Sequence, residues 1–364
     1  MRKAALVAGL IAGLSPRLAA PHETLTTTVL FDREIVRILN RHCVMCHAEN
    51  GPSFPLATYE QTWLARRRIH AETISRHMPP WAAVAGYGEF ANANNLTLRE
   101  TQFIVSWVEG LGPRNSGTVF TNTAEAGAPF KEIRARADFG RWPLGPPDLT
   151  RPLPPNAIEP HQPDQVKRVV INSGLTADRP LRAVEFLPGD RRVVCAAFFT
   201  VQETGQWIGS WTPWYGYLSF PQGSAYKLPA GAHIAAEVHY RSAKERVTDQ
   251  STLGLFFGAG PAPAPVLQVV LESKPARVKF RAETKLAAAT QVFALRPEFP
   301  PGIKTIEVAA RKPDGSTQVL LFAKDIPVDW PTPYILRNPA ALPKGTELSV
   351  TAYGSPVRLT ILAR

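Results

Sequence analysis

The chain has few cysteines and few methionines, with three of each in 364 residues. Three cysteines exclude the dense disulfide framework that stabilises many small secreted domains. No methionine follows Met78, so the rest of the chain offers no thioether ligand. Cys43 and Cys46 nevertheless stand together in one C-x-x-C pattern. A chain this poor in cysteine needs a chemical reason for such a pair.

Long apolar segments are missing after the N-terminus. Residues 1–20 contain Arg2 and Lys3, then an apolar run, then a stretch with small residues that ends at Ala20. This arrangement is typical of a secretory signal peptide, and a frayed N-terminal helix is the alternative interpretation. We expect cleavage near Ala20, a periplasmic or extracellular mature protein, and no transmembrane segment.

The charge is positive and dispersed. The formal net charge is +11, and it remains about +8 when residues 1–20 are removed. A basic exported protein favours partners with acidic surfaces. Lysine and arginine do not cluster with aromatic residues in this chain, so we expect no nucleic-acid partner.

The pattern of apolar residues changes along the chain. Beyond residue 130, short β-rich runs alternate with turn residues, as 35 prolines and 25 glycines favour. Together with the helical pattern near the N-terminus, this change predicts five segments. They are a signal peptide at 1–20, a small all-α domain at 21–111, a linker at 112–130, and β-sandwiches at 131–262 and 263–364.

Two amphipathic helices are predicted within the all-α segment. Phe31, Ile35, Ile38 and Leu39 share one helix face that leads directly into Cys43. A second helix is predicted to start at a capping box formed by Thr97 and Glu100 and to stop at Gly110. Its apolar face consists of Phe103, Ile104, Trp107 and Val108.

Residues 43–47 carry the C-x-x-C-H pattern of covalent c-type haem attachment. At this spacing, the thiols of Cys43 and Cys46 reach the two haem vinyl groups, and His47 lies under the iron. Three alternatives compete. A zinc site needs a second pair of ligands, a thioredoxin-like dithiol needs a preceding strand, and the pattern can arise by chance. We expect one covalent haem c.

The second axial ligand of the iron is predicted to be Met78. Met1 leaves with the signal peptide and Met45 lies between the two cysteines, so Met78 remains. A Met/His pair raises the reduction potential and favours electron transfer. Ordinary core packing of Met78 is the alternative, and His70 and His77 are weaker rivals as ligands.

The order of motifs resembles a known family. The series "CVMCH", "MPPW", "LGPPD", "RAVEFLPGDRRVV", "LPAGAHIAAEVHY", "PDGSTQVLL" and "ALPKGTEL" is similar to bacterial proteins that join a c-type cytochrome to a copper type II, ascorbate-dependent monooxygenase-like domain. Peptidylglycine α-hydroxylating monooxygenase and dopamine β-monooxygenase are relatives of that domain. The resemblance covers residues from about 30 to the end. It implies a multidomain fold in which a small all-α cytochrome c domain precedes all-β tandem jelly-roll sandwiches.

The copper positions that the resemblance implies are mostly substituted. A His-His pair of the family corresponds to Cys195 and Ala196, and His239 matches a third histidine. Glu298 and Pro300 occupy the two positions of a His-x-His pair. Copper and zinc sites usually have three or four protein ligands. We therefore expect no bound copper.

Two main functional hypotheses follow. The first is an exported cytochrome that transfers single electrons to an unknown redox partner protein, with the β-sandwiches as a binding or docking scaffold. The second is an enzyme, a copper- and ascorbate-dependent monooxygenase-like oxidoreductase that receives electrons from the haem. The substituted copper positions favour electron transfer. A haem-based sensor is a third hypothesis that no sequence feature favours.

Overall fold

The computed structural model describes residues 27–116, 141–258, 264–274 and 277–364. Within these residues, three α-helices and a short π-helix are followed by 20 strands. The predicted signal peptide at 1–20 and residues 117–130 of the predicted linker lie outside the described residues. No helix in the described part of the chain is both long and apolar enough to cross a bilayer.

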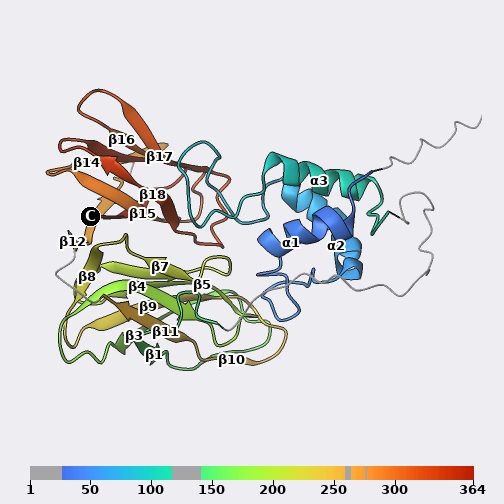
Figure 1. The fold of residues 1–364 in the computed structure, drawn as a ribbon, viewed down its shortest axis with the longest axis horizontal. Coiled ribbons are helices and arrows are strands. Elements are labelled where there is room, and N and C mark those ends of the chain that lie inside the picture. The colour runs from blue at the N-terminus through green and yellow to red at the C-terminus, as the bar shows by residue number, and fades with distance from the viewer. Residues whose placement is uncertain (1–26, 117–140, 259–263, 275–276) are drawn as a thin grey trace, which may run out of the picture.

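The helices occupy the N-terminal part of the chain and lie beside the sandwiches, as Figure 1 shows. Their apolar faces meet around Phe31, Ile35, Leu39 and Trp107, all of which are buried. The capping box at Thr97 is confirmed, and it starts the last helix. The helical elements are the π-helix η1 (Phe31–Ile35), α1 (Val36–His42), α2 (Tyr59–Ile74) and α3 (Leu98–Glu109).

Two sheets form the first sandwich. One has the strand order β1-β11-β4-β8-β12 with β7 paired to β4, and the other has the order β3-β9-β5-β6. A two-stranded sheet of β10 and β2 lies with them. The strands are β1 (Leu149–Pro152), β2 (Asn156–Ile158), β3 (Gln165–Asn172), β4 (Arg179–Leu187), β5 (Val194–Val201), β6 (Trp207–Trp211), β7 (Tyr217–Ser219), β8 (Ser224–Leu228), β9 (His233–Tyr240), β10 (Val247–Asp249), β11 (Thr252–Phe257) and β12 (Ala264–Pro265).

Two four-stranded sheets form the second sandwich, with the orders β13-β20-β15-β18 and β14-β19-β16-β17. The predicted hairpin turn at residues 313–316 is confirmed between β16 and β17, where Gly315 has a φ of 85°. The strands are β13 (Leu267–Glu272), β14 (Lys279–Lys285), β15 (Thr290–Glu298), β16 (Thr305–Arg311), β17 (Thr317–Lys324), β18 (Tyr334–Leu342), β19 (Glu347–Tyr353) and β20 (Arg358–Ala363). Both sandwiches have the jelly-roll-like character that the sequence predicts.

The predicted separate all-α cytochrome c domain is wrong. The described N-terminal residues, 27–116, form only three short α-helices and a π-helix, and most of the described chain is β-sheet. Residues between α2 and α3 leave the helices and join the second sandwich. Ala83 forms a β-bridge with Ala323, and Phe90 forms one with Leu336. Trp81 and Phe90 are buried in the core of that sandwich, so the helices share their connecting segment with a β-structure.

Candidate functional site

One cavity of about 190 Å³ gathers the four residues that the sequence singles out, namely Cys43, Cys46, His47 and Met78. We call it the thiol cavity. Met78 comes from the segment after α2, whereas the other three follow α1. The fold therefore brings the C-x-x-C-H motif and the predicted methionine together. Their role as haem ligands is a separate question.

A tight turn at the end of α1 presents the two cysteines. The amide of Cys43 donates to the Leu39 carbonyl at 2.9 Å and so ends the helix. The Cys43 carbonyl then accepts hydrogen bonds from the amides of Cys46, at 3.1 Å, and His47, at 2.9 Å. A Cβ on Gly51 would lie 2.2 Å from the Cys46 carbonyl oxygen. The loop that contains Gly51 can therefore pack against the backbone of Cys46 only because residue 51 has no side chain.

The two thiols are held in their neutral form. Burial raises the pKa of the Cys43 thiol to about 12, and the carboxylate of Glu100 acts in the same direction. Burial also raises the pKa of the Cys46 thiol to about 12, with Cys43 as a further cause. Neither thiol is a thiolate near neutral pH, so neither is a ready nucleophile.

The His47 imidazole is neutral and has a defined orientation. Burial lowers its pKa below the ordinary value of 6.5, despite the opposing hydrogen bond to Phe54. Nδ1 lies 2.8 Å from the Phe54 carbonyl oxygen, and a carbonyl can only accept, so Nδ1 carries the proton. Nε2 then keeps its lone pair for a ligand or a proton.

Met78 is placed by the end of α2. That helix begins at a capping box formed by Thr58 and Gln61, and the Met78 amide returns to the Glu72 carbonyl at 3.1 Å. His77 also lines the thiol cavity, but its Nδ1 pairs with the carboxylate of Glu72. The other rival ligand, His70, lies near Glu109 on α3, at 3.9 Å between Nε2 and Oε1.

Both sandwiches contribute to the far wall of the thiol cavity. Arg241 follows β9 of the first sandwich, and Asp329 and Trp330 lie between β17 and β18 of the second. The Arg241 guanidinium lies 4.1 Å from the ring centre of Trp330, and its Nη2 is 3.0 Å from Asp329 Oδ2. The cavity therefore adjoins the scaffold directly, which the sequence pattern gives no means of predicting.

The expectation of one covalent haem c is contradicted. Among the described residues, no three or more histidine, cysteine, aspartate or glutamate side chains form a group that could hold a metal ion. The helices around the motif also lack the all-α cytochrome arrangement on which the expectation depended. The C-x-x-C-H spacing fixes the turn but does not determine what the turn binds.

Three of the substituted copper positions lie together in the first sandwich. Ala196 on β5 is the register partner of His239 on β9, and both belong to the same sheet. Cys195 is buried, and its thiol donates to the His239 carbonyl oxygen at 3.3 Å. Burial raises the pKa of this thiol to about 12. Cys195 thus behaves as the small buried residue that the sequence favours.

The other two positions lie apart from His239. Glu298 pairs with Arg358, at 3.4 Å between Oε1 and Nη1, and Pro300 accepts the Ile303 amide in a turn. The side chain that does approach is Arg296, which sequence reasoning missed. Its Nη2 lies 3.7 Å from Glu237 Oε1, and that oxygen is 3.0 Å from His239 Nε2.

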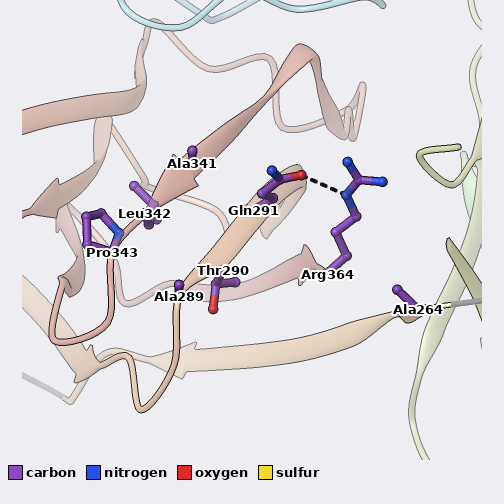
Figure 2. Close-up of a pocket in the computed structure, with 8 residues that line it drawn as sticks. All are labelled: Ala264, Ala289, Thr290, Gln291, Ala341, Leu342, Pro343 and Arg364. Carbon is purple, nitrogen blue, oxygen red and sulfur yellow. Dashed lines mark hydrogen bonds between the residues drawn. The ribbon is translucent and has the colours of Figure 1, made fainter. Parts of the chain in front are cut away.

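A second cavity, of about 610 Å³, has a different character. Figure 2 shows Gln291 facing Arg364, whose Nε donates to the Gln291 side-chain oxygen at 2.7 Å. Arg364 is the sole ionisable side chain among the described residues that line this cavity. The described residues that line this cavity include no cysteine, histidine, aspartate or glutamate.

Comparisons with known proteins do not identify a family. No family model matches the chain, and no curated protein matches it. Among solved structures, the chain is similar to the major capsid protein P2 of bacteriophage PM2, with 8% identity, a TM-score of 0.25, and coverage of 57% of this chain and 96% of that one. It is similar to allantoicase, with 12% identity, a TM-score of 0.20, and coverage of 53% and 76%. It is also similar to the PBSX exported protein XepA, with 8% identity, a TM-score of 0.20, and coverage of 60% and 99%.

Proposed function

We propose that the protein is an exported electron-transfer protein and that the thiol cavity is its redox centre. The observation that carries this proposal is the convergence of Cys43, Cys46, His47 and Met78 on one cavity. Thiols, thioethers and imidazoles are soft, polarisable groups that suit redox chemistry better than hydrolysis. Two carboxylates, Glu72 and Asp329, also line this cavity, and each is already paired, with His77 and with Arg241 respectively.

The state of the thiols favours electron transfer over thiol–disulfide exchange. Exchange begins when a thiolate attacks a disulfide, and a pKa of about 12 for both thiols keeps the thiolate scarce near neutral pH. The neutral His47 has a free Nε2 that can accept a proton when the centre changes its oxidation state. The four side chains therefore serve best as the holders of a redox group, or the Cys43 and Cys46 thiols act themselves. In the second case they lose two electrons to the redox partner, release two protons and form a disulfide.

The sandwiches would then act as the docking scaffold. Arg241, Asp329 and Trp330 connect the wall of the thiol cavity to both sandwiches, so a partner bound to either one approaches the redox centre. The net charge of about +8 that remains without residues 1–20 favours a redox partner with an acidic surface.

The test uses the full chain after export from a host that processes secreted proteins. Absorption spectra and intact masses are recorded in oxidant and in reductant, followed by a potentiometric titration. We expect a reversible change with a defined midpoint potential, and loss of that change in Cys43→Ser and Cys46→Ser. The intact mass shows whether the centre is the thiol pair alone or a group attached to it.

Cys195→Ser is the control, because this third cysteine is buried but does not line the thiol cavity. It should keep the midpoint potential of the wild type. A wild-type protein that shows no reversible oxidation or reduction would refute the proposal, and so would an unchanged titration in the two cavity variants.

A further inference from the structure

A third cavity, of about 550 Å³, lies on the other side of Met78. Met78 and Pro79 line both this cavity and the thiol cavity, so they form a shared partition. Its volume falls within the range of about 300–1,000 Å³ that is typical of small-molecule sites. We call it the Arg76 cavity, after the arginine at its edge.

The Arg76 cavity lies between the helices and the second sandwich. Thr73 lies in the last turn of α2, Arg76 follows that helix, and Lys324 ends β17. The Lys324 amide donates to the Ala82 carbonyl at 3.1 Å, which joins the two walls. The cavity therefore depends on the pairing between residues 81–92 and the second sandwich, and the helices alone would not form it.

Apolar side chains are exposed at this cavity. Leu98 is 77% exposed and Ile74 is 53% exposed, and both line it together with Trp81. Large apolar side chains gathered around a hollow, rather than scattered singly, mark a place where an apolar surface is covered by something else. This feature indicates a ligand with an apolar body.

Positive charge outweighs negative charge at the same place. Arg76 and Lys324 line the cavity, and Asp325 is the single carboxylate among the described residues that do so. Within the described part of the chain, neither cationic side chain has an ion-pair partner or a side-chain hydrogen bond. Their charges are thus available to an incoming anion.

The backbone at this site is unusual. Arg76 has a φ of 59° and Asp325 has a φ of 53°, which places both residues in the left-handed region that favours glycine. Non-glycine residues in this region are held there at a cost of about 1–3 kcal/mol each. The fold therefore keeps the Arg76 side chain where glycine would be easier, which is consistent with a binding role for this side chain.

We propose that the Arg76 cavity binds a small amphipathic organic anion, that is, a carboxylate with an apolar body. The apolar body packs against Trp81, Ile74 and Leu98, and the carboxylate lies toward Arg76 and Lys324. The inference rests on this cavity alone and does not depend on the redox role of its neighbour. Because Met78 separates the two cavities, a bound anion lies one side chain away from the thiol cavity.

The experiment is calorimetric titration of the full chain with 2-naphthoate and with 2-naphthamide, its neutral counterpart of the same shape. We expect naphthoate to bind more tightly than naphthamide. Arg76→Gln and Lys324→Gln should each weaken naphthoate binding by about threefold to fivefold, which is the size of a partly exposed ion pair. Neither substitution should change naphthamide binding.

Two further variants make the result specific. Asp325→Asn removes the opposing charge and should strengthen naphthoate binding, a gain of function that misfolding cannot imitate. Arg67→Gln removes an exposed arginine on α2 that does not line the cavity, and it should have no effect. Equal affinity for the two probes, no naphthoate binding, or equal effects of Arg76→Gln and Arg67→Gln would overturn the proposal.

Discussion

Arg296 on β15 lies 3.7 Å from Glu237 on β9, between Nη2 and Oε1, and this ion pair joins the two sandwiches. The Arg296 guanidinium also lies 4.3 Å from the ring centre of Phe198 on β5. The position beside His239 is thus occupied by a charged contact between sandwiches. Both side chains are partly buried, so this contact should contribute measurably to the stability of the two sandwiches.

The first prediction concerns this ion pair. Arg296→Met leaves the half-buried carboxylate of Glu237 without its partner from the second sandwich. Loss of one member of a fully buried pair costs about 3–5 kcal/mol, and partial exposure should reduce the cost here to about 2 kcal/mol. Urea unfolding followed by tryptophan fluorescence measures it.

Arg168→Gln is the control for that measurement. Arg168 binds the same carboxylate, at 2.8 Å, but its own side chain is 74% exposed. An exposed ion pair contributes about 0–1 kcal/mol, so this variant should lose far less stability than Arg296→Met. Similar losses in the two variants would contradict the assignment of Arg296 as the link between sandwiches.

The second prediction is a pH dependence due to Glu237. The hydrogen bond from His239, with Arg296 and Arg168 as further causes, lowers the pKa of Glu237 from 4.5 to about 2. A carboxyl whose pKa is lower in the folded state stabilises the fold above its unfolded pKa. That stabilisation should decline as pH falls from about 4.5 toward 2. Urea unfolding of wild type and Glu237→Gln at pH 6 and pH 3 tests it, and an unchanged difference between them would refute it.

The third prediction has the opposite sign and concerns Glu185 on β4. Burial raises its pKa from 4.5 to about 7, although the Leu144 amide donates to Oε2 at 3.2 Å. A carboxyl whose pKa is higher in the folded state makes the fold less stable as pH rises from about 4.5 to 7. Glu185→Gln should therefore be more stable than wild type at pH 8, and this advantage should shrink by pH 5. Thermal unfolding at the two pH values tests it, and wild type being the more stable form at pH 8 would contradict it.

The fourth prediction concerns the turn that presents the thiols. Gly51→Ala places a Cβ 2.2 Å from the backbone oxygen of Cys46, so the turn or the loop that contains Gly51 must move. Overpacking of this kind lowers the free energy of unfolding by about 1–3 kcal/mol. Movement of the turn should also increase the rate of maleimide labelling at Cys43 or Cys46, or shift the midpoint potential. Gly258→Ala is the control, since its nearest neighbour would be an ordinary 3.8 Å away. Identical behaviour of the two variants would show that the close approach does not matter.

The sequence predicted the local features well. The capping box at Thr97, the turn at residues 313–316 and the buried face of Phe31, Ile35 and Leu39 all depend on residues a few positions apart. Such features follow from backbone geometry and from the period of the apolar residues. The β-sandwich character of the C-terminal part could be predicted for the same reason.

The incorrect expectations were those that needed contacts between distant residues. The all-α domain was inferred from helical periodicity, but no period reveals that Ala83 pairs with Ala323 or that Phe90 pairs with Leu336. The covalent haem c was inferred from a five-residue spacing, which describes a turn and not its surroundings. Arg296 escaped notice because its partner Glu237 is 59 residues away along the chain.

The sequence by itself therefore determined the C-x-x-C-H turn, the capping box that starts α3 and the succession of short strands, because each of these is encoded within a few neighbouring residues. Only the tertiary structure decided that Met78 faces the same cavity as the thiols, that Arg241 and Trp330 form its far wall, and that Arg76 and Lys324 meet beside it. These relationships depend on how separate apolar faces pack together, and burial of those faces is a property of the whole chain.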